Sequence, residues 1–125
     1  MHGFIHVEIP ARDLRRAKNF YGKVFGWKFQ DFNKEYALFS PPRGGVGGGI
    51  YKAKQIPRRP GVQAYIDVDD IDAKLREIRR ARGKVLKPKA EVMGQGWWAS
   101  FADPQGAVLF LWQSARRQAA GQTGM

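Results

Sequence analysis

The sequence contains no cysteine. Disulfide bonds, thiolate metal sites and a cysteine nucleophile are therefore excluded. No apolar run approaches the roughly 20 residues that a helix needs to cross a bilayer. The first residues also lack the basic and apolar regions of a signal peptide. Together these absences predict a soluble, cytoplasmic protein with no membrane partner.

Acidic residues are scarce as well. Eleven Asp and Glu stand against 22 Lys and Arg, which gives a formal net charge of +11. A surface of this charge attracts anions, including nucleic acids, anionic lipid headgroups and acidic metabolites. The basic residues within 74–82 lie opposite an apolar stripe, a pattern typical of a solvated helix face. We therefore expect an anionic small molecule as the partner and do not expect nucleic acid. The alternative is a charged surface without a specific partner.

An internal repeat organises the chain of 125 residues, which is the length of a single domain. An alternating apolar run leads into an Asp, then into a segment of helical period, then into a Gly and further strand-like runs. A repeat of this length indicates one supersecondary unit that was copied and fused. The matched positions, each 57 residues apart, are Ile9 and Ile66, Asp13-Leu14 and Asp70-Ile71, and Gly26 and Gly83.

Local signals place the elements of each copy. In the first copy, Pro10 is expected to end a strand, Asp13 to cap a helix and Gly26 to stop it. In the second copy Asp70 caps a helix that Gly83 ends, and a tight turn lies at 103–106. The predicted strands are 4–9, 27–32, 36–39, 46–51, 63–68, 96–102 and 107–113, and a further strand begins at 84–86.

The resulting fold class is α+β, with two tandem β-α-β-β-β modules in a single domain over residues 1–125. The first module covers 4–51 and the second 62–113. A linker rich in Pro and Arg joins them at 52–61, and residues 114–125 read as a flexible tail.

Three segments resemble the vicinal oxygen chelate superfamily of glyoxalases, bleomycin-resistance proteins and extradiol dioxygenases. They are HVEIPARDLRRAKNFYGKVFGW (6–27), YIDVDDID (65–72) and DPQGAVLFLW (103–112). The GGGIY run at 47–51 resembles a small glyoxalase-related branch of that superfamily. The likeness covers residues 4–113. It implies that the two modules form a curved mixed β-sheet with the site in its cup, and that chains of this size form a homodimer.

The resemblance also implies where a divalent metal would bind. Glyoxalase-like members use a His on the first strand, an acid on the fourth, a His or Gln on the fifth and a Glu on the eighth. The matching positions here are His6, one of Gly47–Gly49, Gln63 and Phe110. Both carboxylates are lost, so His6 and Gln63 are only weak metal candidates. We therefore expect no tightly held metal and no conventional glyoxalase I activity.

The alternation of the strands predicts which side chains share a face with His6 and Gln63. The parity of the seventh strand allows either Trp97 or Trp98 to join this face, and we choose Trp98. A second layer of this kind, beside apolar faces that already serve two helices, favours a ligand pocket. Packing in a core or at a dimer interface is the alternative. The predicted ligand-binding residues are Phe4, Gln63, Tyr65, Trp98, Phe110 and Trp112.

His6 and Glu8 lie two residues apart on one strand face and are the predicted catalytic residues. A neutral imidazole oriented by a carboxylate can act as a general base. A structural histidine with satisfied hydrogen bonds is the alternative. The sequence thus predicts a glyoxalase-related enzyme, of lyase or isomerase type, that acts on a small oxygenated or aromatic, anionic metabolite. A non-catalytic protein that binds and sequesters such a compound, as bleomycin-resistance proteins do, is the second hypothesis.

Overall fold

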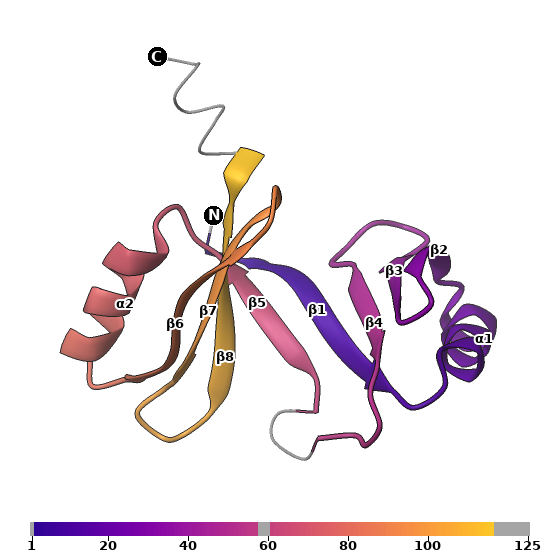
Figure 1. The fold of residues 1–125 in the computed structure, drawn as a ribbon, viewed down its shortest axis with the longest axis horizontal. Coiled ribbons are helices and arrows are strands. Elements are labelled where there is room, and N and C mark those ends of the chain that lie inside the picture. The colour runs from indigo at the N-terminus through magenta and orange to yellow at the C-terminus, as the bar shows by residue number, and fades with distance from the viewer. Residues whose placement is uncertain (1, 58–60, 117–125) are drawn as a thin grey trace. The chain divides into compact units, whose positions relative to one another are not determined.

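The computed structural model describes residues 2–57 and 61–116 (Figure 1). The described residues form two compact units, and the boundary between them falls inside β5, between Ala64 and Tyr65. The first unit holds β1 (Phe4–Ala11), α1 (Leu14–Phe25), β2 (Lys28–Asn33), β3 (Tyr36–Ser40) and β4 (Gly48–Lys52). The second holds β5 (Gln63–Asp67), α2 (Ile71–Arg80), β6 (Lys84–Val92), β7 (Gly96–Ala102) and β8 (Val108–Ser114). The predicted α+β class and the order β-α-β-β-β, written twice, are confirmed.

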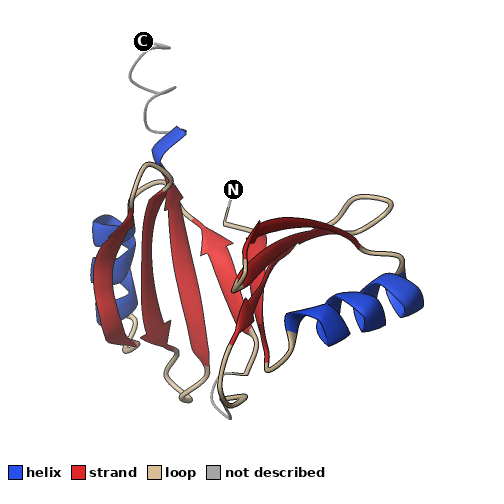
Figure 2. Ribbon diagram, turned by 45° about the vertical axis from the view of Figure 1, so that its right-hand side comes forward, coloured by secondary structure: helices blue, strands red, loops and turns tan. Residues whose placement is uncertain are grey.

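The strands of each unit pair in the same order. In the first unit the order is β2-β3-β4-β1, with β1 and β4 parallel and the other pairs antiparallel. In the second unit it is β6-β7-β8-β5, with β5 and β8 parallel. Each helix lies along one face of the strands of its own unit (Figure 2). We call the other face of each unit its open face.

The helix starts are confirmed by their caps. Asp13 and Asp70 are both extended, and each accepts a hydrogen bond from the backbone N–H three residues later at 3.1 Å. This bond satisfies one of the donors that the first turn of a helix leaves unpaired. Gly26 ends α1 with a left-handed φ of 73°, as the sequence predicts. Among the described residues, neither helix is long and apolar enough to span a membrane.

The end of α2 differs from the prediction. The helix stops at Arg80, and Arg82, not Gly83, takes the left-handed conformation with a φ of 71°. The N–H of Arg82 donates to Arg79 O at 3.1 Å and that of Gly83 to Ile78 O at 2.8 Å. These two bonds are those of a Schellman motif, with Arg82 where glycine is usual. Gly83 is needed for another reason, because a Cβ there would lie 2.6 Å from Ile78 Cγ2.

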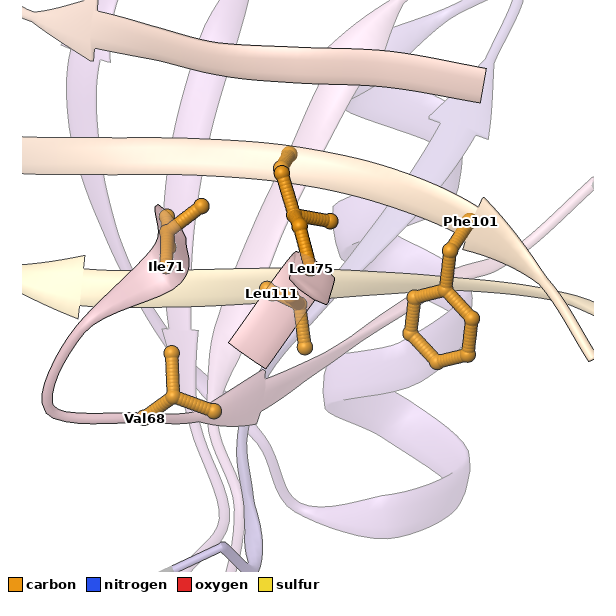
Figure 3. Packing of buried hydrophobic residues seen from close by; sticks show 6 residues of the cluster. Val68, Ile71, Leu75, Phe101 and Leu111 are labelled. Carbon is orange, nitrogen blue, oxygen red and sulfur yellow. The ribbon is translucent and has the colours of Figure 1, made fainter. Parts of the chain in front are cut away.

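The core of the second unit lies between α2 and its strands (Figure 3). Ile71 and Leu75 come from the helix and are buried. The buried strand and loop residues that complete this core are Val68, Ala99, Phe101 and Leu111. Deep burial of these aliphatic side chains is the main stabilising term for a unit of this size.

The first unit has its own core, in which aromatic rings stack. Trp27 stacks on Phe39 and on Tyr21, with ring centroids 4.2 and 4.8 Å apart. The apolar face of α1 is only partly used, because Val24 and Phe25 remain 56% and 53% exposed. Residues Ala11, Phe39 and Ile50 form the buried centre, and Val7, Ile9, Leu14, Ala17 and Phe29 also pack against it.

Several predicted boundaries need correction. Pro10 does not end β1, because its extended backbone continues the strand and pairs with Tyr51. The last strand lies one residue later than predicted, from Val108 to Ser114, whereas the strand predicted to begin at Lys84 does so and runs to Val92. The predicted turn at 103–106 is confirmed: Gly106 N donates to Asp103 O at 2.9 Å. Residues 58–60 of the linker and 117–125 of the predicted tail lie outside the described residues.

Candidate functional site

The open face of the first unit carries His6 and Glu8. Val7 and Ile9 of β1 pack into the core against α1, so the residues that alternate with them face the other way. His6 Nε2 and Glu8 Oε2 are 2.5 Å apart. The side chain of His6 is 32% exposed and that of Glu8 only 15%. The structure therefore brings the two predicted catalytic residues together, with the carboxylate held largely out of water.

Tyr36, the first residue of β3, joins this pair. Its hydroxyl donates a hydrogen bond to Glu8 Oε2 at 2.5 Å and lies 3.3 Å from His6 Nε2. The sequence prediction missed Tyr36 because the residue is 28 positions from Glu8 along the chain. Only the order of the strands reveals the contact. The result is a cluster of three groups that can exchange protons, in which His6 Nε2 and the Tyr36 hydroxyl meet one carboxylate oxygen.

Gly49 makes this contact possible. Strand β4 lies between β3 and β1, and Gly49 pairs with Leu38 on one side and with Glu8 on the other. Two strand spacings amount to about 10 Å, so Tyr36 must cross over β4 to reach Glu8. A Cβ on Gly49 would lie 1.9 Å from the Tyr36 hydroxyl. The absence of a side chain at Gly49 is therefore a condition for the cluster.

The neighbouring Gly48 serves a different purpose. It pairs with Val7, and a Cβ there would lie 1.8 Å from the backbone oxygen of Val7. Paired residues of adjacent strands point to the same side, so Gly48 faces the side of Val7 and Gly49 the side of Glu8. Of the three glycines at the fourth-strand position of the resemblance, Gly49 is thus the one that pairs with Glu8.

Tyr51 lies beside the cluster as the partner of Tyr36 in the β3–β4 pairing. Burial raises the pKa of its phenol above the ordinary value of 10.0, and the nearby charge of Glu8 raises it further. Both effects disfavour the phenolate. Tyr51 therefore stays neutral over the physiological pH range and supplies no second anion to the site.

The residues present do not fit the four-ligand metal site of the resemblance. The described residues contain no group of three or more His, Cys, Asp or Glu placed to hold a metal ion. Tyr36 takes up the space in front of Gly49, and Phe110 is an apolar, buried residue of β8. Zinc-type sites in proteins normally take three or more protein ligands. The weak metal candidates His6 and Gln63 thus lack the carboxylates of the fourth and eighth strands that would complete such a site.

The open face of the second unit carries the predicted aromatic residues. The ring of Phe110 lies 5.0 Å from that of Tyr65 and 6.0 Å from that of Trp98, between centroids. Trp112 pairs with Trp98 across β7 and β8. Trp97, the alternative to Trp98, packs against the core beneath α2. Four of the six predicted ligand-binding residues are therefore neighbours on one sheet face.

The other two predicted ligand-binding residues lie at the starts of strands. Phe4 is the first residue of β1 and is 53% exposed. Gln63 is the first residue of β5 and is half-buried. Their part in a ligand site stays a prediction.

A cavity of about 510 Å³ lies elsewhere in the second unit, at the N-terminal end of α2. Its wall includes Asp69, Asp70 and Asp72, together with Arg76 and Lys89. None of the predicted site residues lines this cavity. Three carboxylates at its wall make it a poor match for the anionic ligand that the net charge favours.

Comparison with known proteins extends the resemblance. A family model described as the Glyoxalase/Bleomycin resistance protein/Dioxygenase superfamily matches residues 3–110. A protein of Mycobacterium tuberculosis that carries the name of a glyoxylase is 30% identical over 127 aligned residues, which cover 88% of this chain and 45% of the relative. An anthracycline biosynthesis protein of Streptomyces peucetius is 36% identical over 135 aligned residues, which cover 94% of this chain and 49% of the relative.

Among solved structures, methylmalonyl-CoA epimerase from Mycobacterium tuberculosis superposes with a TM-score of 0.72. The match covers 94% of this chain and 91% of the epimerase at 20% sequence identity, a level at which the likeness concerns the fold alone. The chain spans about half the length of the two curated relatives it matches.

Proposed function

The chain belongs to the glyoxalase/bleomycin resistance protein/dioxygenase superfamily, and on that premise we propose that it is an enzyme of isomerase or lyase type that moves a proton on a small oxygenated or aromatic, anionic metabolite. His6 and Glu8 have the acid–base roles, and Tyr36 acts with them. The single observation that carries the proposal is the meeting of His6 Nε2 and the Tyr36 hydroxyl on one oxygen of Glu8.

Glu8 is the proton acceptor in this proposal. The contacts of Oε2 with His6 Nε2 and the Tyr36 hydroxyl fix the orientation of the carboxyl group. The other oxygen, Oε1, takes a proton from the carbon beside the carbonyl group of the substrate. Return of that proton to the opposite face or to the neighbouring atom completes an isomerisation without any change in oxidation state. The low exposure of Glu8 strengthens these contacts, since little water competes for the carboxylate.

We further propose that the open face of the second unit is a surface that binds an aromatic compound. Tyr65, Trp98 and Trp112 are half-buried and surround the buried Phe110, and their partly exposed aromatic surface suits a planar ligand. Phe4 and Gln63 stay proposed ligand-binding residues. The name of the Streptomyces peucetius relative supports the aromatic class, since anthracyclines are planar, polycyclic aromatic compounds.

Proton exchange tests the proposed chemistry directly, without knowledge of the product. The protein is incubated in D2O with enolisable 2-oxo acids, including 2-oxobutanoate and phenylpyruvate, and loss of the C–H signal is followed by NMR. We expect exchange above the spontaneous rate, and a loss of 10²-fold or more in Glu8→Gln, which is the usual contribution of a general base. Exchange that persists unchanged in Glu8→Gln would overturn the assignment of the base.

Sequestration without catalysis is the second candidate, and the aromatic face favours it. In this case the protein binds a planar aromatic compound but catalyses no proton exchange with any of the 2-oxo acids. The Glu8→Gln variant then binds the compound as tightly as the wild type does. Titration followed by tryptophan fluorescence measures that binding.

We also propose that the protein is a homodimer. The curated relatives are about twice as long as the part that matches this chain, so two copies of the chain equal one relative in length. Sedimentation equilibrium across a tenfold concentration range tests this, and a concentration-independent monomer mass would refute it.

A further inference from the structure

Strand β6 contains two irregularities that change the direction of its side chains. Between Val85 and Lys87, β6 advances two residues while β7 advances one, from Phe101 to Ser100. Between Lys87 and Ala90 it advances three residues while β7 advances two. Each extra residue moves the following side chains to the opposite face of the sheet. Without these bulges, Val85 and Lys87 would share one face.

The bulges place Lys87 on the open face. Val85 and Phe101 pack with the core under α2, whereas Lys87 pairs with Ser100 on the other side. Ser100 in turn pairs with Phe110, and Phe110 with Tyr65. This row therefore crosses all four strands of the unit from a lysine at the β6 edge to a tyrosine on β5.

Two lysines of β6 lie over two consecutive tryptophans. Lys87 Nζ is 5.9 Å from the centroid of the Trp98 ring, and Lys89 Nζ is 4.7 Å from that of Trp97. Since Trp97 packs in the core and Trp98 contacts Phe110, the two pairs lie on opposite faces. A lysine ammonium over an indole ring is held by the negative face of the ring.

The two lysines differ in how their charge is balanced. Lys89 Nζ lies 3.8 Å from a carboxylate oxygen of Asp72 on α2. Within the part of the chain that the structure describes, no ion pair involves Lys87. Asp67, an acid on the same face, belongs to the far strand β5, where it pairs with Trp112 of β8. Three strand spacings, about 14 Å, separate the backbones of these strands. The charge of Lys87 is thus available to an anion.

We propose that Lys87 and Trp98 form the anion-recognising end of a binding site for planar aromatic anions on the open face of the second unit. The inference rests on the proposed function in taking this face as the ligand-binding surface. The ring of the ligand stacks on Trp98 and its neighbours, and a carboxylate at the ring edge meets the ammonium of Lys87. Neutral and cationic aromatic compounds lose this second contact.

A lysine on an edge strand also has a simpler explanation, because charge there discourages edge-to-edge pairing of sheets. For that purpose the lysine side chain could point to either face of the sheet. The two bulges, by contrast, turn Lys87 toward the aromatic row and return Lys89 to the side of α2. The position of the charge relative to Trp98 is therefore what the experiment must probe.

The test compares 2-naphthoate with its neutral amide, 2-naphthamide, by tryptophan fluorescence titration of the full-length protein at low and high salt. We expect the wild type to bind the anion at least tenfold more tightly than the amide, with the difference reduced by salt. Lys87→Met should abolish the preference, and Lys87→Arg should retain most of it. Equal binding of the two probes by the wild type would overturn the proposal.

Lys89→Met is the matched control. It lies on the same strand over the neighbouring tryptophan, and the proposal expects it to keep the preference for the anion. An equal loss in Lys89→Met and Lys87→Met would show a general charge effect and would overturn the proposal. Since 2-naphthoate has no enolisable proton, this result does not depend on the chemistry of Glu8. If the protein binds 2-naphthoate in a Lys87-dependent way but catalyses no proton exchange, the proposed enzymatic activity is refuted. The proposed anion-binding site is then supported on its own.

Discussion

The hydroxyl of Tyr36 lies 2.5 Å from Glu8 Oε2, although a whole strand separates the two residues. The contact exists because Gly49 of that intervening strand leaves room for the phenol. Where the resemblance expects a carboxylate on the fourth strand, this chain thus has a tyrosine from the third strand reaching over a glycine. At this place the resemblance implies a metal ligand, whereas Tyr36 supplies a hydrogen-bond donor.

Removal of that donor is the first test. Tyr36→Phe deletes one hydrogen bond to an ionised group, which contributes about 1.5–3 kcal/mol. If this stabilisation is used in the reaction, proton exchange should slow by about 10- to 100-fold. We expect the loss in kcat rather than in KM, because Tyr36 orients Glu8 and does not hold the ligand. The measurement is exchange in D2O at limiting and saturating concentrations of the compound that the wild type exchanges.

Tyr51→Phe is the matched control for this experiment. It removes a phenol from the same face. The charge of Glu8 raises the pKa of Tyr51, but Tyr51 donates no hydrogen bond to Glu8. A loss as large in Tyr51→Phe as in Tyr36→Phe would contradict a specific role for Tyr36.

Gly49→Ala tests the same contact from the other side. The new Cβ would meet the Tyr36 hydroxyl at 1.9 Å, so the phenol must move away from Glu8. We expect exchange to fall about as far as in Tyr36→Phe. In the double variant the two losses should not add, because both remove one contact. Additive losses in the exchange assay would show that Gly49 acts elsewhere.

Signals within one turn or one strand were enough to predict most of the fold. Asp13 and Asp70 cap their helices through bonds to the third residue beyond, and the turn at 103–106 closes within four residues. The repeat then supplied the architecture, since a segment copied with its local signals folds in the same way twice. The errors also have local causes. Pro10 fits an extended strand, and Arg82 takes the left-handed position that Gly83 was expected to fill.

The site was harder to predict because it depends on register and strand order. His6 and Glu8 are neighbours on one strand, so alternation alone predicted their pairing. Tyr36 is close to them only because β4 lies between β3 and β1. Lys87 reaches the open face through two bulges, of which only the second contains a residue of a type that favours a bulge, Pro88. The choice between Trp97 and Trp98 likewise needed the pairing of β7 with β8.

The donor set predicts how the purified protein binds metal. With no cluster of three or more suitable side chains among the described residues, we expect less than one equivalent of Zn or Ni by elemental analysis after mild purification. Turnover of the glutathione hemithioacetal of methylglyoxal should be absent or marginal for the same reason. A full equivalent of metal that disappears in His6→Ala would show that the site has been rebuilt around other ligands.

The raised pKa of Tyr51 predicts a dependence of stability on high pH. The folded protein holds the phenolic proton more tightly than the unfolded chain does, so this stabilisation is complete below pH 10 and is lost as the pH rises through the folded pKa. Urea unfolding of the wild type and of Tyr51→Phe between pH 8 and 11 measures the difference. The wild type should lose more stability over this range than the variant, and parallel curves would contradict the predicted shift.

Arg82 offers a stabilising substitution in the C-terminal cap of α2. A non-glycine residue in the left-handed conformation is strained by about 1–2 kcal/mol, and Arg82 has a φ of 71° there. Arg82→Gly removes that strain but makes the unfolded chain more flexible, so we expect a net gain of about 0.5–1 kcal/mol in the free energy of unfolding. The control is Arg76→Gly in the helix interior, which should lose about 1 kcal/mol. Both are measured by urea denaturation. A destabilised Arg82→Gly would mean that the arginine side chain makes a contact worth more than the strain of its backbone.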